Sequence, residues 1–595
     1  MRRKPVRLAA AIVFTLALVA SACSDRNSVL DAEASNERGE STGASASSGD
    51  LQWGGCASEM AQLRSDSDMA GLLPPLECST LAVPLDHSDP NGESIDLELV
   101  RQEATGSDSE RIGSLLFNPG GPGGSGIEFL ANASAIMPDE VQARFDLVSW
   151  DPRGVAESTP VRCLSDSAKD EQIEGDLSPD TEAELEQAVE DQEEFLQGCE
   201  ANHPDMIEHM STADVAADMD LIRQALGDDQ LNYVGFSYGT AIGATYATMF
   251  PDKVRAMVLD GSVSPSATDV EQGVAQAQGF ERTYLNFVSA CDSDPECALS
   301  GSTAATVDSS RAALDAEPLA VDTPSGEREL TRDLFDLGLA TALYDTTTWG
   351  PLARSIRDLE DGGGEFLLSL ADRQLGRNPD GTWDNSSDAQ TMVGCADSGY
   401  RPSLEQAVED GDTLAAASPT FGDIFRTGSI GCLDWPLAAN PVPEWTAAGA
   451  PPILVIGTIG DPATPYEWSE QMDDALIESV LLTYEGDGHT AFLRAGPCIN
   501  DAVVAYLVDL TLPAAGTRCA AADAGDGGSF AGIRQQLIDE ITAAGLPADV
   551  ANCIVDSLEN EFGASGLDEL LLGDDIDALT ESVSRATLGC MTGGS

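Results

Sequence analysis

The stretch LNYVGFSYGTAIGATYATMF, residues 231–250, decides the fold. It holds a G-x-S-x-G pentapeptide centred on Ser237, with the apolar run LNYV before it and a run of small residues after it. A strand, a sharp turn and a helix form the setting of a nucleophile elbow, in which Gly235 and Gly239 leave room for closely packed backbones. With 57 glycines in the chain the pentapeptide can also arise by chance, so its meaning depends on the surrounding sequence.

Short apolar runs alternate with amphipathic stretches on both sides of this pentapeptide. LLF at 115–117, FDLVSW at 145–150 and VRAMVLD at 254–260 predict buried strands. Between 211 and 227, apolar residues recur at helical spacing behind a Ser-Thr cap and before a glycine stop, which predicts an amphipathic helix. Strands and helices that alternate in this way predict an α/β fold, with a mostly parallel central sheet flanked by helices.

This alternation is lost from 262 to 440, where helical segments and acid-rich turns replace it. A strand followed by a turn returns in PPILVIGTIGDPATP at 451–465 and in SVLLTYEGDGHT at 479–490. We therefore expect residues 51–261 and 441–520 to build one sheet, with 262–440 inserted between them as a mainly helical cap.

The two ends of the chain differ from this core. Residues 1–22 combine a basic start with an apolar run of about 15 residues, which is typical of an export signal and too short for a membrane span. The small residues before Cys23 resemble a bacterial lipobox, in which this cysteine is acylated; Ala20 stands where Leu is usual, so ordinary cleavage is the alternative. Residues 23–50 are polar and predict a disordered tether, whereas 525–595 predict a small all-α appendage.

The chain is strongly acidic, with a formal net charge of −72. Such a surface repels phosphate backbones, so we expect no nucleic-acid partner. We interpret the charge as an adaptation for solubility at high ionic strength, in preference to the binding of one specific cation.

Thirteen cysteines are present, and setting aside Cys23 leaves an even number that suits disulfides in an exported protein. Sequence alone does not determine the connectivity, but pairing neighbours in chain order keeps each bridge within one segment. A zinc site is the competing use of cysteine; without a repeated C-x-x-C and with four histidines, we expect no metal and no cofactor. The pairs expected on this basis are Cys56–Cys78, Cys163–Cys199, Cys291–Cys297, Cys395–Cys432, Cys498–Cys519 and Cys553–Cys590.

A serine nucleophile needs an adjacent base and a third group that orients the base. His489 lies in EGDGHT directly after the run VLLTY, whereas the other histidines lie in polar stretches before the pentapeptide. Asp461 lies in GTIGDPATP after the run ILVIG, at the strand end where open α/β sheets place their sites. Asp487 is the rival acid, but it is only two residues from the histidine and badly placed to reach the ring. The order Ser237, Asp461, His489 is that of α/β-hydrolases.

The run LLFNPGGPGGSG, residues 115–126, brings glycines directly after a predicted strand. Backbone N–H groups in such a run can approach the negative charge that develops on a substrate oxygen. A phosphate-binding loop is the alternative, but the run lacks G-K-[ST], and an exported chain is separated from nucleotides.

Together, NPGGPGGSG, WDPRGVAES, MSTADVAADMDLIRQALG, YVGFSYGT, GTIGDPATP and GDGHT resemble the secreted tripeptidyl aminopeptidases of actinobacteria, which are α/β-hydrolases related to proline iminopeptidase. The likeness covers residues 50–520 and leaves out the tail. Where that family commonly has the second glycine of R-G-x-G-x-S, this chain has Ala156. The resemblance implies Ser237 as nucleophile, His489 as general base and then acid, Asp461 as orienting group, and the N–H groups of Gly121 and Tyr238 as oxyanion hole.

The sequence therefore predicts a serine hydrolase, anchored by a lipid on Cys23 at the outer face of the bacterial membrane or secreted. The resemblance implies an aminopeptidase, of the tripeptidyl or prolyl type, that cleaves peptides with a free N-terminus. Recognition of that amine calls for a carboxylate; the predicted cap offers several, Asp397 among them, and sequence does not rank them. A carboxylesterase or lipase with the same triad is the first alternative, because one fold hosts both chemistries. A peptide-binding lipoprotein without catalysis is the second.

Overall fold

The computed structural model describes residues 51–56, 75–134, 136–175, 177–359 and 362–521, and also 550, 552–555, 557–558 and 590. The described fold of 51–521 belongs to one unit of the chain, and the residues from 550 onward belong to a second. The predicted export signal and tether lie outside the described residues, as does most of the predicted appendage. Among the helices of the described ranges, none has both the length and the apolar character that crossing a membrane requires.

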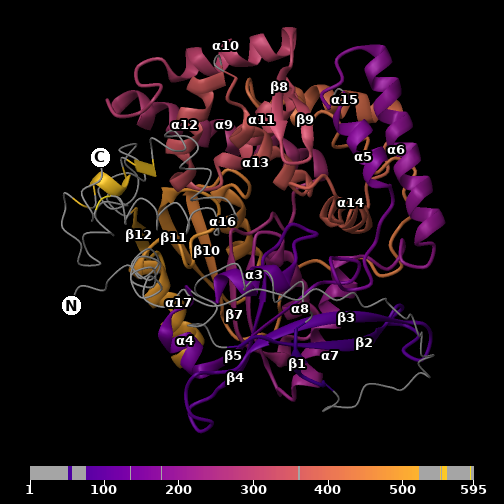
Figure 1. The fold of residues 1–595 in the computed structure, drawn as a ribbon. Helices are drawn as coiled ribbons and strands as arrows, with labels where there is room; N and C mark the ends of the chain where they lie inside the picture. The colour runs from indigo at the N-terminus through magenta and orange to yellow at the C-terminus, as the bar shows by residue number, and fades with distance from the viewer. Residues whose placement is uncertain are drawn as a thin grey trace, which may run out of the picture. The chain divides into compact units, whose positions relative to one another are not determined.

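A ten-stranded sheet runs through the unit of 51–521 (Figure 1). Its strands are β1 (Gly54–Gly55), β2 (Glu77–Pro84), β3 (Ser94–Gln102), β4 (Gly113–Asn118), β5 (Phe145–Trp150), β6 (Leu231–Phe236), β7 (Val254–Asp260), β10 (Ile453–Gly460), β11 (Ser479–Asp487) and β12 (Arg518–Ala520). They follow the order β1-β2-β3-β5-β4-β6-β7-β10-β11-β12. From β5 to β12 neighbouring strands are parallel, whereas β1, β2 and β3 add an antiparallel edge. The predicted mostly parallel sheet is confirmed.

Burial explains why some strands were visible in the sequence. Every residue of β4, β5 and β6 is buried, which is why these strands are continuous apolar runs. In β2 buried and exposed positions alternate, as expected where one face of an antiparallel edge meets solvent. The sequence analysis did not predict β3, which completes this edge.

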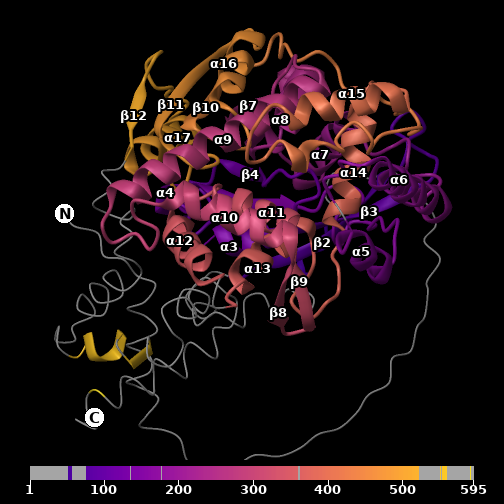
Figure 2. The ribbon, with the colours of Figure 1, turned by 90° about the horizontal axis from the view of Figure 1, so that it is seen from above.

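Helices flank the sheet (Figures 1 and 2). The predicted amphipathic helix is confirmed as α7: the side chain of Ser211 accepts the Asp214 N–H at its start, and Gly227 ends it in the left-handed conformation. The buried row of Val215 and Met219 joins the main apolar core between helices and sheet. The elements of this layer are α3 (Gly126–Ala133), α4 (Asp139–Arg144), α7 (Thr212–Leu226), α8 (Gly239–Met249), η1 (Pro251–Lys253), α16 (Tyr466–Ala475) and α17 (Pro497–Asp509).

Between β7 and β10 the chain builds a second, mainly helical layer with an apolar cluster of its own (Figure 1). We call this layer the cap. A two-stranded antiparallel hairpin within it was not predicted. Its elements are α9 (Asp269–Ser293), α10 (Thr303–Ala316), β8 (Leu319–Thr323), β9 (Gly326–Leu330), α11 (Arg332–Ala342), η2 (Thr346–Thr348), α12 (Trp349–Asp358), α13 (Glu365–Leu375), α14 (Ser386–Asp397), α15 (Leu404–Ala415) and η4 (Asp423–Phe425).

Two helices from an earlier part of the chain, α5 (Asp166–Ile173) and α6 (Glu182–Asn202), lie beside the cap helices in both ribbon views (Figures 1 and 2). Lys169 of α5 forms an ion pair with Asp388 of α14. Asp170 accepts hydrogen bonds from the Arg377 guanidinium at 2.8 Å and from the Trp383 indole at 3.1 Å. The helical layer over the sheet is therefore built from two separate segments of the chain.

Six disulfides of the described residues close short stretches of chain, with partners 6 to 37 positions apart in the sequence. The pairing in chain order is confirmed for every pair expected from the sequence. The last bridge, Cys553–Cys590, lies within the second unit. The bridges are Cys56–Cys78, Cys163–Cys199, Cys291–Cys297, Cys395–Cys432, Cys498–Cys519 and Cys553–Cys590.

Candidate active site

Ser237 lies on the turn between β6 and α8, with a φ of 53° and a partly exposed side chain. This left-handed backbone is costly for a residue other than glycine and is typical of a nucleophile elbow. A Cβ added to Gly235 would lie 2.3 Å from the Gly239 carbonyl oxygen, and one added to Gly239 would lie 2.7 Å from that of Asn118. Both glycines of the pentapeptide are therefore required by close backbone contacts.

Asp461 follows β10 and His489 follows β11, and the structure brings the two side chains together. The His489 Nδ1 lies 2.9 Å and 3.0 Å from the two carboxylate oxygens of Asp461. Asp461 also accepts the Thr464 N–H at 2.8 Å and hydroxyl at 3.1 Å, and its exposed fraction is 1%. With Nδ1–H donated to this carboxylate, the other ring nitrogen of His489 carries the lone pair that a general base needs.

The rival acid, Asp487, points elsewhere: it accepts a hydrogen bond of 2.7 Å from the Asn286 amide of α9. Two of the other histidines are also engaged away from the pair. His87 contacts the Asp218 carboxylate at 2.9 Å, and the ring of His203 accepts the Arg162 N–H at 2.8 Å.

Asp260, at the end of β7, connects the serine turn to the histidine loop. Its carbonyl accepts the Ser237 N–H at 2.9 Å, and its carboxylate accepts the N–H groups of Ala491 at 3.0 Å and Phe492 at 2.7 Å. A Cβ added to the next residue, Gly261, would lie 3.4 Å from the His489 Cε1. Burial raises the pKa of the Asp260 carboxyl to about 6. The sequence analysis did not single out this residue, although an acid at a buried strand end was a signal.

The glycine-rich run after β4 lies against the serine turn. A Cβ added to Gly120 would lie 2.9 Å from the Ser237 Cβ and 3.0 Å from the Tyr238 nitrogen. Gly120 and Gly121 have φ values of 97° and 112°, which glycine adopts without strain. Asn118 anchors the run by accepting the Gly120 N–H at 2.9 Å. The two predicted oxyanion donors, Gly121 and Tyr238, thus belong to segments in direct contact.

The cap contributes to the same site. The ring of Tyr344, between α11 and η2, meets the His489 ring edge-on with centroids 5.2 Å apart, and its carbonyl accepts the His489 N–H at 2.8 Å. Arg494 holds this contact: its guanidinium lies 3.0 Å from the Asp345 carboxylate and donates to the Tyr344 carbonyl at 3.1 Å. The sequence analysis did not single out these cap residues, because no local pattern links residue 344 to residue 489.

A second cap contact reaches the side chain of Tyr238. Its hydroxyl lies 2.5 Å from that of Thr212, which donates at 2.5 Å to the carboxylate of Asp397. The Thr212 N–H donates to the same carboxylate at 2.6 Å. Burial raises the pKa of the Asp397 carboxyl to about 7, although the hydrogen bonds from Thr212 act in the opposite direction.

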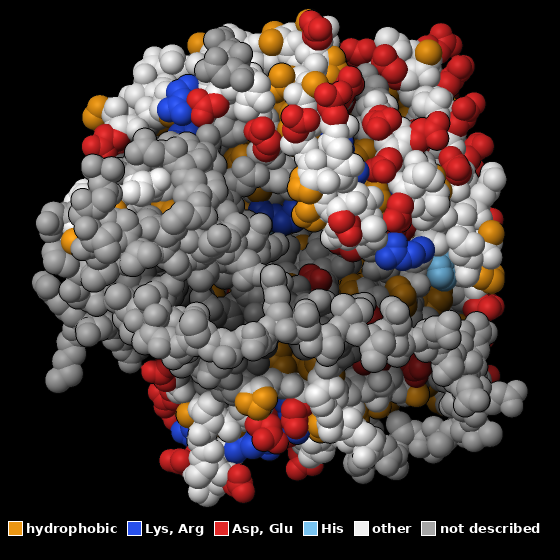
Figure 3. Space-filling model, in the orientation of Figure 1, with side chains coloured by type: hydrophobic (Ala, Val, Ile, Leu, Met, Phe, Trp, Pro, Cys, Tyr) orange, Lys and Arg blue, Asp and Glu red, His pale blue; other side chains and the backbone are white. Residues whose placement is uncertain are grey.

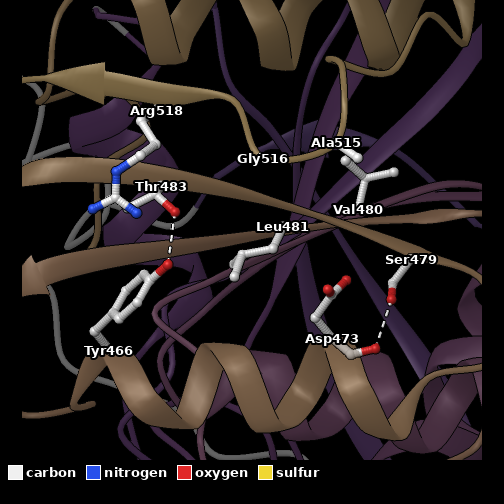
Figure 4. Close-up of a pocket in the computed structure, with 9 residues that line it drawn as sticks. All are labelled: Tyr466, Asp473, Ser479, Val480, Leu481, Thr483, Ala515, Gly516 and Arg518. Carbon is white, nitrogen blue, oxygen red and sulfur yellow. Dashed lines mark hydrogen bonds between the residues drawn. The ribbon is translucent and has the colours of Figure 1, made fainter.

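Figure 4 shows a pocket of about 260 Å³ between α16, β11 and β12, which no member of the predicted triad lines. Tyr466 and Thr483 share a hydrogen bond of 2.8 Å in it, and the Arg518 side chain lies beside them. Within the ranges that the structure describes, no group of His, Cys, Asp or Glu side chains is arranged to hold a metal ion.

Known proteins are similar in sequence to most of this chain. A profile of the α/β hydrolase fold matches residues 113–495, a range that includes the serine turn, Asp461 and His489. The serine protease Hip1 of Mycobacterium tuberculosis is 36% identical over 457 residues, which are 74% of this chain and 87% of that protein. The tripeptidyl aminopeptidase of Streptomyces lividans is 32% identical over 482 residues, 79% of this chain and 86% of that protein. Carboxylesterase B of M. tuberculosis is 34% identical over 454 residues, 74% of this chain and 86% of that protein. By the extent of these matches, this chain belongs to the α/β-hydrolase fold family.

Proposed function

We propose that this chain is a serine aminopeptidase that removes short peptides, tripeptides in particular, from free N-termini through an acyl-enzyme. The observation that carries the proposal is the Asp461–His489 pair, with 2.9 Å between His489 Nδ1 and the carboxylate, joined through Asp260 to the strained turn of Ser237. Two relatives named as peptidases, with more than 30% identity over most of this chain, support peptides as substrates.

In the proposed reaction Ser237 Oγ attacks the scissile carbonyl carbon while the His489 Nε2 takes its proton. The N–H groups of Gly121 and Tyr238 donate to the oxygen on which negative charge develops. As the C–N bond breaks, the imidazolium returns the proton to the leaving amine, and Asp461 stabilises the imidazolium in between. A water molecule then attacks the ester carbonyl with His489 again as base, which releases the peptide acid and restores the Ser237 hydroxyl.

An esterase is the second candidate, and the 34% identity to carboxylesterase B favours it. The same three side chains serve either reaction, so the leaving group has to be tested directly. We propose peptidase activity because Asp397, whose hydrogen-bond donors among the described residues are the uncharged N–H and hydroxyl of Thr212, lies two hydrogen bonds from Tyr238, where a substrate amine can be recognised.

The test uses tripeptide p-nitroanilides with a free or an acetylated N-terminal amine. The matching tripeptide p-nitrophenyl esters are used in the same two forms, free and acetylated. We expect wild type to cleave the free anilide, and Ser237→Ala to cleave nothing and to lose labelling by a fluorophosphonate probe. Ester cleavage without any anilide cleavage identifies the esterase. A probe that labels wild type and Ser237→Ala equally contradicts both candidates and leaves a binding lipoprotein.

We propose further that residues 1–22 direct export and that Cys23 carries a lipid, at the outer face of the cell membrane. The supporting observations are the basic start, the apolar run and the small residues before this cysteine. The acidic surface fits an extracellular setting: on the face in Figure 3, acidic side chains are far more numerous than basic ones, above all over the cap. Incorporation of labelled palmitate into wild type and not into Cys23→Ser is the expected result.

The proposed domains keep the boundaries expected from the sequence, with core segments 51–261 and 441–520, a cap at 262–440 and an appendage at 525–595. Helix α5 of the first core segment packs against the cap through Lys169 and Asp170. Expression of a chain that ends at residue 524 tests the boundary of the appendage: it should fold and keep the activity of wild type.

A further inference from the structure

One face of the cap helix α14 is less buried than the other among the described residues. Its buried residues are Asp388, Ala389, Met392, Val393, Cys395 and Ala396. The opposite row consists of Ser386, Gln390, Gly394 and Asp397, which are exposed or partly exposed and succeed one another at helical spacing. We call these four residues the α14 stripe.

The first turn of the α14 stripe rests on the glycine-rich run of the candidate site. A Cβ added to Gly123 would lie 2.3 Å from the Ser386 carbonyl oxygen and 3.3 Å from the Gln390 nitrogen. Gly123 lies two residues after Gly121, the predicted oxyanion donor. The stripe therefore begins where the scissile carbonyl of a bound substrate would lie.

The middle of the stripe faces open space. A Cβ added to Gly394 would meet no atom of the described residues within 4 Å. Glycine inside a helix lowers stability relative to alanine, so its presence at an exposed position calls for a reason outside the helix. An extended peptide that passes close to the helix would supply that reason, because any side chain at position 394 would project into its path.

The stripe ends on a carboxylate that is suited to a cation. Both oxygens of Asp397 accept hydrogen bonds from Thr212, yet no ion pair to Asp397 is found in the described part of the chain. The side chain is partly exposed. A carboxylate in a largely buried setting gains most from a partner of opposite charge, and a primary ammonium group provides both charge and donors. Thr212 also bonds to Tyr238, so this end of the stripe is tied back to the serine turn.

The part of the stripe from Gln390 to Asp397 matches a short peptide in length. These two residues are seven positions apart, which is about 10 Å at the rise of an α-helix. Three residues of extended chain also span about 10 Å. A peptide whose free amine meets Asp397 would therefore place its third carbonyl group beside the glycine-rich run.

We propose that the α14 stripe binds the N-terminal part of the substrate, with Asp397 receiving the free α-amine and the length of the stripe selecting three residues. This inference rests on the proposed peptidase function and names the residues that would give it exopeptidase specificity. Asp397 acts here as a specificity-determining residue, and it takes no part in the bond-breaking steps.

The first test is Asp397→Asn, which keeps the side-chain shape and removes the charge. We expect kcat/KM for a free-amine tripeptide anilide to fall about 10- to 100-fold, mainly through KM, because a hydrogen bond to a charged group is lost. The ratio of kcat/KM for the free over the acetylated tripeptide anilide should fall by the same factor. The rate of fluorophosphonate labelling, compared with that of wild type, reports whether the serine turn of the variant is intact. A variant that still prefers free over acetylated substrates as strongly as wild type overturns the proposal, while the peptidase function stands.

The second test is Gly394→Leu, which fills the open space beside the stripe. Leucine is the better helix former, so the variant should unfold at the same temperature as wild type or higher, while cleavage of the tripeptide anilide falls more than 10-fold. Ala313→Leu, on the exposed face of α10, is the matched control and should change neither. Normal tripeptide turnover by Gly394→Leu contradicts the proposed path of the substrate.

Binding measurements on an inactive variant separate the proposed amine recognition from the proposed peptidase activity. Calorimetry should detect a free tripeptide bound to Ser237→Ala, and should detect tenfold weaker binding to the Ser237→Ala, Asp397→Asn double variant. If wild type cleaves only esters, the ratio of kcat/KM for a free-amine tripeptide ester to that for its acetylated form tests amine recognition. This ratio should fall in Asp397→Asn. Equal binding of free and acetylated tripeptides to Ser237→Ala overturns amine recognition, whatever reaction the enzyme catalyses.

Discussion

The two sides of the candidate site are held in different ways. On the histidine side, Asp461 and Asp260 take hydrogen bonds from several backbone N–H groups and from the His489 ring, and both carboxylates are buried. On the side of α14, Thr212 is the hydrogen-bond partner of Asp397 found among the described residues, and the Asp397 side chain remains partly exposed. A Cβ added to Gly394 would meet no described atom within 4 Å. The carboxylates that we propose to hold the catalytic histidine loop are surrounded by fixed partners, whereas the groups that we propose to meet a substrate keep part of their surface exposed.

The largest loss of activity should come from a change at Asp461, on the histidine side. Asp461→Asn keeps the shape of the side chain but disturbs the tautomer of His489, so we expect kcat to fall about 10⁴-fold. Asp487→Asn is the matched control, since that carboxylate faces Asn286. Steady-state kinetics on the tripeptide anilide should show less than a threefold change for the control. Equal losses in the two variants would argue against Asp461 as the orienting group.

Asp260 tests whether the link between the two loops matters for rate. In Asp260→Asn an amide NH₂ replaces one of the oxygens that accept the N–H groups of Ala491 and Phe492, so we expect kcat to fall about 100-fold with little change in KM. Asp336→Asn is the control, because Asp336 is a buried carboxylate of the cap that pairs with Arg311. This variant should have a lower melting temperature and an unchanged kcat. The Asp260 interpretation fails if its variant loses stability alone.

The cap contact at His489 should have a smaller effect. Tyr344→Phe keeps the ring against the imidazole and should retain kcat within threefold, whereas Tyr344→Ala removes the edge-on packing and should lower kcat about tenfold. The backbone hydrogen bond from the His489 N–H is kept in both variants. If Phe and Ala behave alike, the ring does not position the histidine.

The smallest effect concerns stability against pH. Burial raises the pKa values of Asp260 and Asp336 to about 6 and of Asp397 to about 7, so the folded protein holds protons that the unfolded chain has already released. The free energy of unfolding should therefore fall as the pH rises from about 4 to about 7. Asp397→Asn should flatten this slope by at most about 1.4 kcal/mol per pH unit. Urea unfolding at several pH values gives the slope, and an unchanged slope in the variant would contradict the raised pKa of Asp397.

The parts of the fold that the sequence predicted are those with local signatures. Buried parallel strands are apolar runs, α7 has a cap and a stop, and Ser237, Asp461 and His489 each follow such a strand. The parts that it missed depend on contacts between distant segments. Neither the packing of α5 against α14 nor the meeting of Tyr344 with His489 leaves a periodic pattern, and β3 was missed beside β2.

Ala156 illustrates how a departure from a family pattern is accommodated. It stands at the position of the second glycine in the pattern R-G-x-G-x-S, and it adopts a positive φ of 43°. Its N–H donates at 2.9 Å to the Asn385 side chain, the residue that precedes α14. The strained backbone is thus held in place by the cap helix that we propose binds substrate.

The order of the disulfides has a consequence for how the chain matures. From Cys56 onward the cysteines bond in consecutive pairs along the chain, from Cys56–Cys78 through Cys498–Cys519 to Cys553–Cys590. A chain that enters an oxidising compartment from its N-terminus presents its cysteines in this same order. Oxidation as the chain arrives would therefore produce the native pairs one after another, and shuffling of wrong pairs would not be required.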